Sequence, residues 1–278
     1  MITYNRADYT RMSLARLVET ADEHTRLWLW HNGNDAETLA VAREFEPHFH
    51  RFHHSPENKK LAEPTNWLFQ SSEGAYLSKV DDDCLMPEGW LATLRDAHEA
   101  EPRLGVVGCW RFLEEDFRPE AAARKIQDVA GGHRLMRHPW VEGSGYLMKR
   151  GCVEGAGGLR DGESFTDYCL RLALSGWING WYFPFLWQEH LDDPRAPHSL
   201  LDDDEAFRSH LPLSAATFDT RSLAEWDARL RQSARELQES PWQAHHYVGW
   251  RRALRRLPRR FQQMLARLRG ADGNGATR

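Results

Sequence analysis

The sequence predicts an α/β protein with a mostly parallel, three-layer sheet, followed by a region of helices only. Two observations lead to this expectation. Over the first three-quarters of the 278 residues, short apolar runs alternate with segments of helical periodicity. After about Ala206 the strand-like runs stop and only helical patterns remain. The sequence has neither G-x-G-x-x-G nor G-x-x-x-x-G-K-[ST] after a predicted strand, so the usual dinucleotide and P-loop signatures are absent.

The predicted strands and helices follow one another in turn. Strands are expected at residues 2–4, 26–30, 49–52, 75–80 and 104–110, and helices at 11–19, 35–45, 65–70 and 87–100. The first helix is predicted by Met12, Leu14, Leu17 and Val18, whose spacing forms one apolar face. The last has a proline in its first turn, where proline is tolerated. Loops after the strands are expected to gather at one edge of the sheet, where α/β proteins bind ligands.

The helical region begins with a recognisable start signal. Ser222 and Glu225 have the spacing of a capping box, which predicts a helix to about Ser240. Another helix is expected from about Gln243 to Arg256, before Pro258. We therefore divide the chain into an α/β domain at 1–205, a helical extension at 206–270 and a flexible tail at 271–278.

Composition excludes several classes of protein. A hydrophobic content of 41% and a net charge of −5 argue against a disordered acidic chain and against general nucleic-acid binding. The longest apolar stretch, Trp177 to Trp187, is too short and too interrupted to span a bilayer. Polar residues come too early for a signal peptide. The four cysteines lie far apart, which favours reduced thiols in a cytosolic protein over a disulfide framework or a zinc site.

The charge is unevenly distributed. Residues 250–270 contain eight of the 36 basic side chains and no acid, so the rest of the chain carries 28 basic against 41 acidic residues. Leucines and a phenylalanine interleave these arginines, which is typical of a basic amphipathic segment on an anionic membrane surface. An ordinary surface helix is the alternative. Nucleic-acid binding is disfavoured because the acidic body would be repelled.

The sharpest chemical signal is Asp81-Asp82-Asp83 at the end of a predicted strand. Three adjacent carboxylates repel one another, and a divalent cation held by one or two of them together with substrate phosphates relieves this. A solvated acidic turn that caps the next helix is the alternative. The second acidic run, Asp202 to Glu205, follows no apolar strand and is expected to be a solvated loop or helix cap.

Further segments, in order along residues 1–191, resemble family 2 glycosyltransferases of the GT-A fold. The matching segments are Thr3–Arg6, Trp30–Asp35, Thr65–Asn66, Lys79–Asp83, Pro87–Trp90, Gly143–Met148, Gly157–Leu159, Asp167–Arg171, Gly176 and His190. In that family they correspond to the nucleotide-binding loop, the Asp-Asn-Gly loop, the Arg-Asn pair, the DxD strand with its next helix, the acceptor-side strand with its turn, and the acidic helix start with the metal-binding histidine. Their order makes the resemblance specific, and it implies a GT-A fold with a three-layer α/β/α mixed sheet and a C-terminal helical extension.

The resemblance also implies roles for individual residues. Asp83 would coordinate Mn²⁺ or Mg²⁺ that bridges the donor diphosphate, and His190 would be a further metal ligand. The implied donor-binding residues are Thr3, Asn5, Arg6, His31, Asn32, Asn66, Asp81 and Asp82. Trp140 and Gly145 belong to the acceptor side, where the Trp140 ring either stacks on a sugar or packs in the core.

Three departures from the family pattern stand out. The family's base-contacting aspartate is replaced by His31, which puts a uracil preference in doubt and leaves guanine or thymine nucleotides open. The opening strand is short, so we expect the true start of the chain to lie upstream of Met1. The family's catalytic base usually lies six residues before the helix arginine, at Phe165, which cannot accept a proton. Asp167 is the first alternative, although it also fits a helix cap, and Glu163 and Asp161 are the others.

The sequence thus predicts a cytoplasmic, metal-dependent, inverting glycosyltransferase of the hexosyltransferase type. It would use a UDP-, GDP- or dTDP-linked donor and a glycan or lipid-linked acceptor in polysaccharide biosynthesis, peripheral on the inner face of a membrane. One alternative is a sugar-phosphate nucleotidyltransferase, disfavoured because no glycine-rich basic loop follows the first strand. The other is a non-catalytic GT-A-like module that binds sugar nucleotide or glycan, which the missing base at Phe165 favours.

Overall fold

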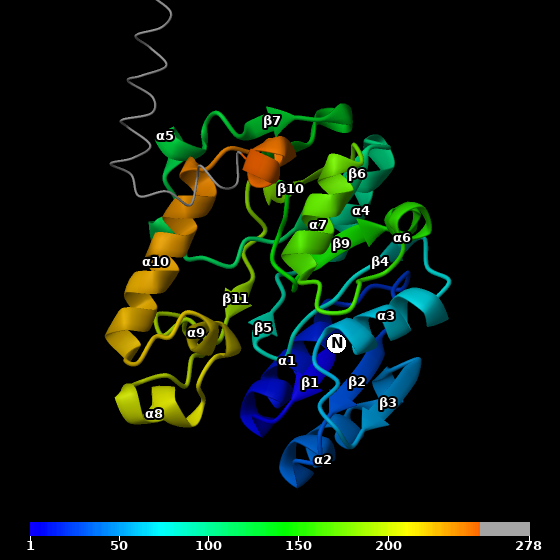
Figure 1. Ribbon diagram of the computed structural model, residues 1–278. Coiled ribbons are helices and arrows are strands. Elements are labelled where there is room, and N and C mark those ends of the chain that lie inside the picture. The colour runs from blue at the N-terminus through cyan, green and yellow to red at the C-terminus, as the bar shows by residue number, and fades with distance from the viewer. Residues whose placement is uncertain (251–278) are drawn as a thin grey trace, which may run out of the picture. The chain divides into compact units, whose positions relative to one another are not determined.

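The computed structural model describes residues 1–250 (Figure 1). Residues 1–242 form one compact unit, and a second begins at Gln243. Of the second, the structure describes the 3₁₀ helix η4 (Ala244–Tyr247), followed by Gly249 with a left-handed φ of 58°. The helix predicted from about Gln243 therefore begins as a 3₁₀ helix, α-helical residues start only at Gly249, and the rest of the predicted helix lies outside the described residues. The eight arginines of the predicted basic segment and the tail at 271–278 lie outside the described residues.

The first sheet is parallel, as the alternation of strands and helices predicts. It contains β1 (Ile2–Tyr4), β2 (Trp28–Asn32) and β3 (Arg51–Ser55), paired in that order. The connections carry α1 (Ala7–Thr20), then α2 (Ala36–Glu44) with the short η1 (Glu46–His48). Thr3 pairs with His31 and His31 with His54, so the carboxyl ends of the three strands lie side by side.

The second sheet is mixed and has six strands. Their spatial order is β4 (Tyr76–Leu77), β9 (Tyr146–Lys149), β6 (Leu104–Gly108), β10 (Ile178–Phe183), β8 (Arg134–Arg137) and β7 (Ile126–Asp128). Only the β6–β10 pairing is parallel among these strands of the described chain. A parallel bridge between Ile2 and Asp81 joins the two sheets at the acidic triplet.

A small ribbon brings distant residues to the same place. β5 (Cys84–Leu85) and β11 (Glu189–His190) pair antiparallel, with His190 opposite Cys84. β5 directly follows the acidic triplet along the chain, and β5 and β11 lie near the centre of the molecule in Figure 1.

The remaining helices cover these strands. They are α3 (Ala62–Ser71), α4 (Trp90–Ala100), α5 (Pro119–Ala122), α6 (Arg150–Ala156), α7 (Phe165–Leu174), α8 (Asp204–Ser209), α9 (Leu213–Thr217) and α10 (Leu223–Glu239), with 3₁₀ turns η2 (Glu114–Asp116) and η3 (Ala130–Gly132). Ser222 caps α10, where its side chain accepts a hydrogen bond from Glu225 N, as the capping-box spacing predicts. Within residues 1–250, no helix combines the length and the apolar character needed to cross a membrane.

The helical extension shares its core with the second sheet. Trp226 and Leu230 of α10 are buried in the same cluster as Trp110 and Trp181. The Trp226 indole nitrogen also donates to the carbonyl oxygen of Asp192 at 2.6 Å. The division of the chain at residue 205 remains a prediction, but the packing ties α10 to the segment that follows β11.

Candidate active site

The first two aspartates of the triplet that follows β4 make different hydrogen bonds. Asp81 accepts a hydrogen bond from Lys79 Nζ at 2.5 Å, and its main-chain nitrogen donates to Ser144 Oγ at 2.9 Å. Asp82 accepts from the main-chain nitrogen of Tyr4 at 2.8 Å and from Thr10 Oγ1 at 3.3 Å. Asp82 therefore holds the turn between β1 and α1.

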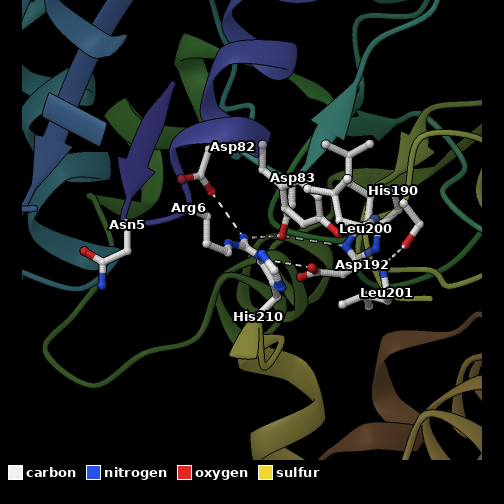
Figure 2. A network of polar contacts seen from close by, with 12 residues as sticks. Asn5, Arg6, Asp82, Asp83, His190, Asp192, Leu200, Leu201 and His210 are labelled. Carbon is white, nitrogen blue, oxygen red and sulfur yellow. Dashed lines mark hydrogen bonds and ion pairs between the residues drawn. The ribbon is translucent and has the colours of Figure 1, made fainter. Parts of the chain in front are cut away.

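Arg6 supplies the positive charge among these acids (Figure 2). Its guanidinium lies 3.5 Å from Asp82, 3.3 Å from Asp83 and 2.7 Å from Asp192. Asn5 and Arg6 both have left-handed backbones, with φ of 51° and 60°. Non-glycine residues rarely adopt this conformation, and it is typical of functional turns. Here it directs the arginine into the acidic centre.

The charges in this centre shift one another's ionisation. Burial raises the pKa of Asp82 to about 7, with Arg6 opposing and Asp83 reinforcing the shift. Burial also acts to raise the pKa of Asp83, but the nearby His190 and Arg6 outweigh it and lower that pKa below its usual range. Asp83 is therefore the member of the triplet that stays ionised most readily.

Asp83 and His190 have the properties of a divalent-cation site. Asp83, Cys84 and His190 place potential ligand atoms within 4.8 Å of one another, and Asp83 Oδ2 lies 4.0 Å from His190 Nε2. Burial lowers the pKa of His190 to about 4, so its ring is neutral, the form that binds metal. Burial raises the pKa of the Cys84 thiol, which donates to Asp83 Oδ1 at 3.2 Å. A carboxylate and a neutral imidazole suit Mn²⁺ or Mg²⁺ better than a protonated thiol does.

His31, Thr3 and Asn32 lie at the carboxyl ends of β1 and β2 but are buried. The His31 ring is fully buried, and its Nδ1 lies 2.9 Å from Thr3 Oγ1. Burial lowers the pKa of His31 to about 4, so this ring is neutral as well. The Asn32 amide oxygen accepts from Trp30 Nε1 and Lys59 N, and its nitrogen donates to Lys60 O. These bonds hold the loop after β3, at Lys59 and Lys60, against the carboxyl end of β2.

Asn66 and Gly145 have mainly architectural contacts. The Asn66 side chain exchanges two hydrogen bonds of 2.8 Å with the main chain of Leu159 and so holds the turn after α6. Gly145 has a φ of 66°, and a Cβ built on it would overlap Gln188 Oε1. This position requires glycine because the Gln188 side chain packs directly against it.

The acceptor-side residues lie in the segment between β8 and β9 and around the start of α7. Trp140 is half-buried, with its ring 4.3 Å from that of His138, and it packs against the core. Asp167 is exposed and accepts from Ser164 Oγ at 2.7 Å, while its main-chain nitrogen donates to the same oxygen. Glu163 forms a two-oxygen ion pair with Arg171, at 2.9 and 2.8 Å.

Sequence reasoning missed Arg111, Glu142 and Asp192. Arg111 lies just beyond β6, with its Nη1 3.3 Å from His190 Nε2, and Asp192 is the strongest partner of Arg6. Glu142 lies 3.7 Å from Arg111. Arg111 could have been found because it is a polar residue directly after a predicted strand. Asp192 could have been found because it is an acid two residues after the candidate metal histidine.

Two solved structures illustrate the proteins that share this fold. The mannosyltransferase PcManGT from Pyrobaculum calidifontis, in complex with GDP-Man and Mn²⁺, aligns with a TM-score of 0.56 at 17% identity, over 85% of this chain and 71% of that chain. TarS residues 1–349 from S. aureus, in complex with UDP, aligns with a TM-score of 0.54 at 9% identity, over 86% of this chain and 89% of that chain. At these identities the likeness establishes the fold. A search of curated protein sequences gives no match.

The mixed sheet, with its carboxylates at the strand ends, defines the class as a GT-A glycosyltransferase fold. The sequence profile described as glycosyl transferase family 2 matches residues 1–150, more than half of the chain. The chain belongs to glycosyl transferase family 2. The resemblance stated from the sequence is therefore confirmed.

Proposed function

We propose that this chain transfers a sugar from a nucleotide-sugar donor to a glycan or lipid-linked glycan, in a metal-dependent reaction that inverts the anomeric centre. The observation that carries the proposal is the Asp83–His190 pair next to the Arg6 guanidinium, at the strand ends of a family 2 chain. A hexosyl donor and a role in polysaccharide biosynthesis are part of the same proposal.

The donor side supplies charge of both signs. Asp83 and His190 would hold Mn²⁺ or Mg²⁺, which would supply Lewis-acid stabilisation of the departing nucleoside diphosphate. The Arg6 guanidinium offers parallel N–H donors suited to a phosphate. Asp82 keeps the β1–α1 turn in the geometry that presents Arg6. Thr3, Asn5, His31, Asn32, Asn66 and Asp81 remain proposed donor-side residues.

The acceptor side must supply a carboxylate that removes the hydroxyl proton as the acceptor oxygen attacks. Asp167 and Glu163 are the candidates that the sequence puts forward near α7. Trp140 offers an aromatic face for a sugar ring, and Gly145 is the other proposed acceptor-side residue. The arginines beyond residue 250 support a cytoplasmic protein that lies against an anionic membrane surface.

The experiment that tests the donor site is a calorimetric binding panel of UDP, GDP, dTDP and CDP, with and without Mn²⁺. We expect one nucleotide to bind tightly with metal, and Asp83→Ala to weaken that binding by at least about 10-fold. Asp96→Asn, an exposed acid on α4, is the matched control and should bind like the wild type. A folded protein that binds none of the four nucleotides would refute the donor site.

A second candidate function is a binding module without turnover. It is favoured by one observation, the Phe165 side chain at the family's base position. This candidate would bind nucleotide in the panel but release no nucleoside diphosphate from any sugar nucleotide.

A further inference from the structure

The carboxylates Glu163 and Asp167, near the start of α7, make local contacts. The Phe165 ring stacks on Tyr146, with ring centroids 4.3 Å apart and an interplanar angle of 21°. Both oxygens of Glu163 accept from Arg171, and one also accepts from the main-chain nitrogen of Arg160. Asp167 is exposed and bonded to the cap residue of its own helix. None of these contacts involves the candidate cation site, whereas Glu142, on the segment that leads into β9, is linked to that site through Arg111.

We propose that Glu142 is the catalytic base of this chain, an inference that rests on the proposed function. Glu142 lies just before Gly143, in the segment that leads into β9. Its Oε2 accepts from the indole nitrogen of buried Trp181 at 2.7 Å, which fixes the carboxylate. The side chain is 18% exposed, so it is positioned by the core yet open to a ligand.

The second oxygen of Glu142 is available. Its Oε1 lies 3.7 Å from Arg111 Nε, a distance that makes an ion pair but not a hydrogen bond. Within residues 1–250, Arg111 Nε is buried and has no hydrogen-bond partner. A hydroxyl group placed here can donate to Glu142 Oε1 and accept from Arg111 Nε. The acceptor Glu142 Oε1 and the donor Arg111 Nε can therefore both bind the same hydroxyl group.

Arg111 also links this carboxylate to the donor side. Its Nη1 lies 3.3 Å from His190 Nε2, and the same His190 atom lies 4.0 Å from Asp83 Oδ2. Glu142 is therefore separated from the candidate cation site by a single arginine side chain.

The chemical step balances with these groups. The acceptor O–H bond breaks, and its proton passes to Glu142 Oε1. The oxygen lone pair forms a bond to the anomeric carbon, while the bond from that carbon to the diphosphate oxygen breaks and its electron pair leaves with the nucleoside diphosphate. Arg111 is a positioning residue that orients the hydroxyl oxygen. The exposed part of Glu142 then returns the proton to solvent.

The test compares Glu142→Gln with Asp167→Asn and Glu163→Gln. The measurement is release of nucleoside diphosphate from UDP-, GDP- and dTDP-linked sugars with Mn²⁺, with water as acceptor, alongside calorimetric binding of the free nucleotide. We expect Glu142→Gln to lose about 10²- to 10⁴-fold in turnover, as removal of a general base does. Nucleotide affinity should stay within about 2-fold, because the amide oxygen of the introduced side chain can still accept from the Trp181 indole. Asp167→Asn and Glu163→Gln should each lose less turnover than Glu142→Gln. Asp96→Asn, which changes an exposed acid on α4, is the control and should keep turnover within about 3-fold of the wild type.

Each other outcome is decisive. Full turnover in Glu142→Gln, or a comparable loss in Asp167→Asn or Glu163→Gln, would overturn the assignment of the base and leave the proposed function standing. Nucleotide binding without turnover by the wild type would contradict the base and favour the binding module. Absence of nucleotide binding would refute the proposed function itself. Glu142→Asp keeps a carboxylate and is the control for misfolding. It should recover part of the turnover that Glu142→Gln loses.

Discussion

The two sides of the active site differ in how closely their arginines are paired with carboxylates. On the donor side, Arg6 lies between Asp82, Asp83 and Asp192, and Asp82 also accepts from the β1–α1 turn. A single guanidinium there pairs with three carboxylates, and this pairing needs no ligand. The α10 helix reinforces this side, because Trp226 holds the main chain of Asp192.

The acceptor side is less tightly paired. Arg111 lies 3.7 Å from Glu142, and its buried Nε finds no hydrogen-bond partner in the described part of the chain. A buried donor without a partner costs stability, and an acceptor hydroxyl bound there would satisfy it. We therefore expect Arg6 to be held in place before a ligand binds, and Arg111 to be held more firmly once the acceptor is bound.

The largest expected effect is on the donor side. Arg6→Gln removes the cation shared by three carboxylates, two of them buried, and should lower the free energy of unfolding by about 3 to 4 kcal/mol. Urea denaturation measures this. Arg11→Gln, which breaks an exposed pair with Glu44 on the same helix, is the control and should change little.

Added Mn²⁺ sharpens this prediction. Because a divalent cation would replace the missing positive charge, Mn²⁺ should raise the melting temperature of Arg6→Gln more than that of the wild type. An equal rise in the two proteins would show that Arg6 and the cation do not share the same carboxylates.

The next effect concerns the tight packing on the acceptor side. Gly145→Ala places a Cβ against Gln188 at a backbone φ of 66°, and it should cost about 2 to 3 kcal/mol. Gly89→Ala is the matched control, because its φ is also 66° but nothing lies within 4 Å of the added atom. Chemical denaturation of both variants separates crowding from backbone strain, and equal losses would contradict the packing argument.

The smallest effect is a titration remote from both sides. Burial lowers the pKa of His98 from 6.5 to about 4, against the hydrogen bond that its Nε2 makes with Leu147 O at 2.9 Å. A lowered pKa means that the unfolded chain binds the proton more tightly, so the stabilisation is complete above pH 6.5 and declines as the pH falls toward 4. At pH 5 the loss should be about 2 kcal/mol.

Denaturation curves against pH for the wild type and His98→Gln measure this loss, because Gln can donate to Leu147 O without titrating. The stability of His98→Gln should fall less between pH 6.5 and 5. An exposed-histidine variant, His24→Gln, should follow the wild type. Parallel curves for all three proteins would show that His98 does not supply the pH dependence.

The sequence by itself determined the local features of this protein. The alternation of strands and helices predicts the parallel first sheet, and the spacing of Ser222 and Glu225 predicts the start of α10. The family resemblance follows from short motifs in order, including the acidic triplet. These features are readable because helix caps, strand runs and turns depend on side chains only a few residues apart.

Only the tertiary structure decided which groups meet. The pairing of β5 with β11 brings His190 to Asp83 across more than a hundred residues, and the left-handed turn at Arg6 places its guanidinium against Asp192. His31 occupies the expected strand end, yet its side chain is buried. Glu142 meets Arg111 because β9, β6 and β10 are neighbours in the sheet. Burial and long-range pairing depend on how the sheets and helices pack together, and no local pattern of residues encodes that packing.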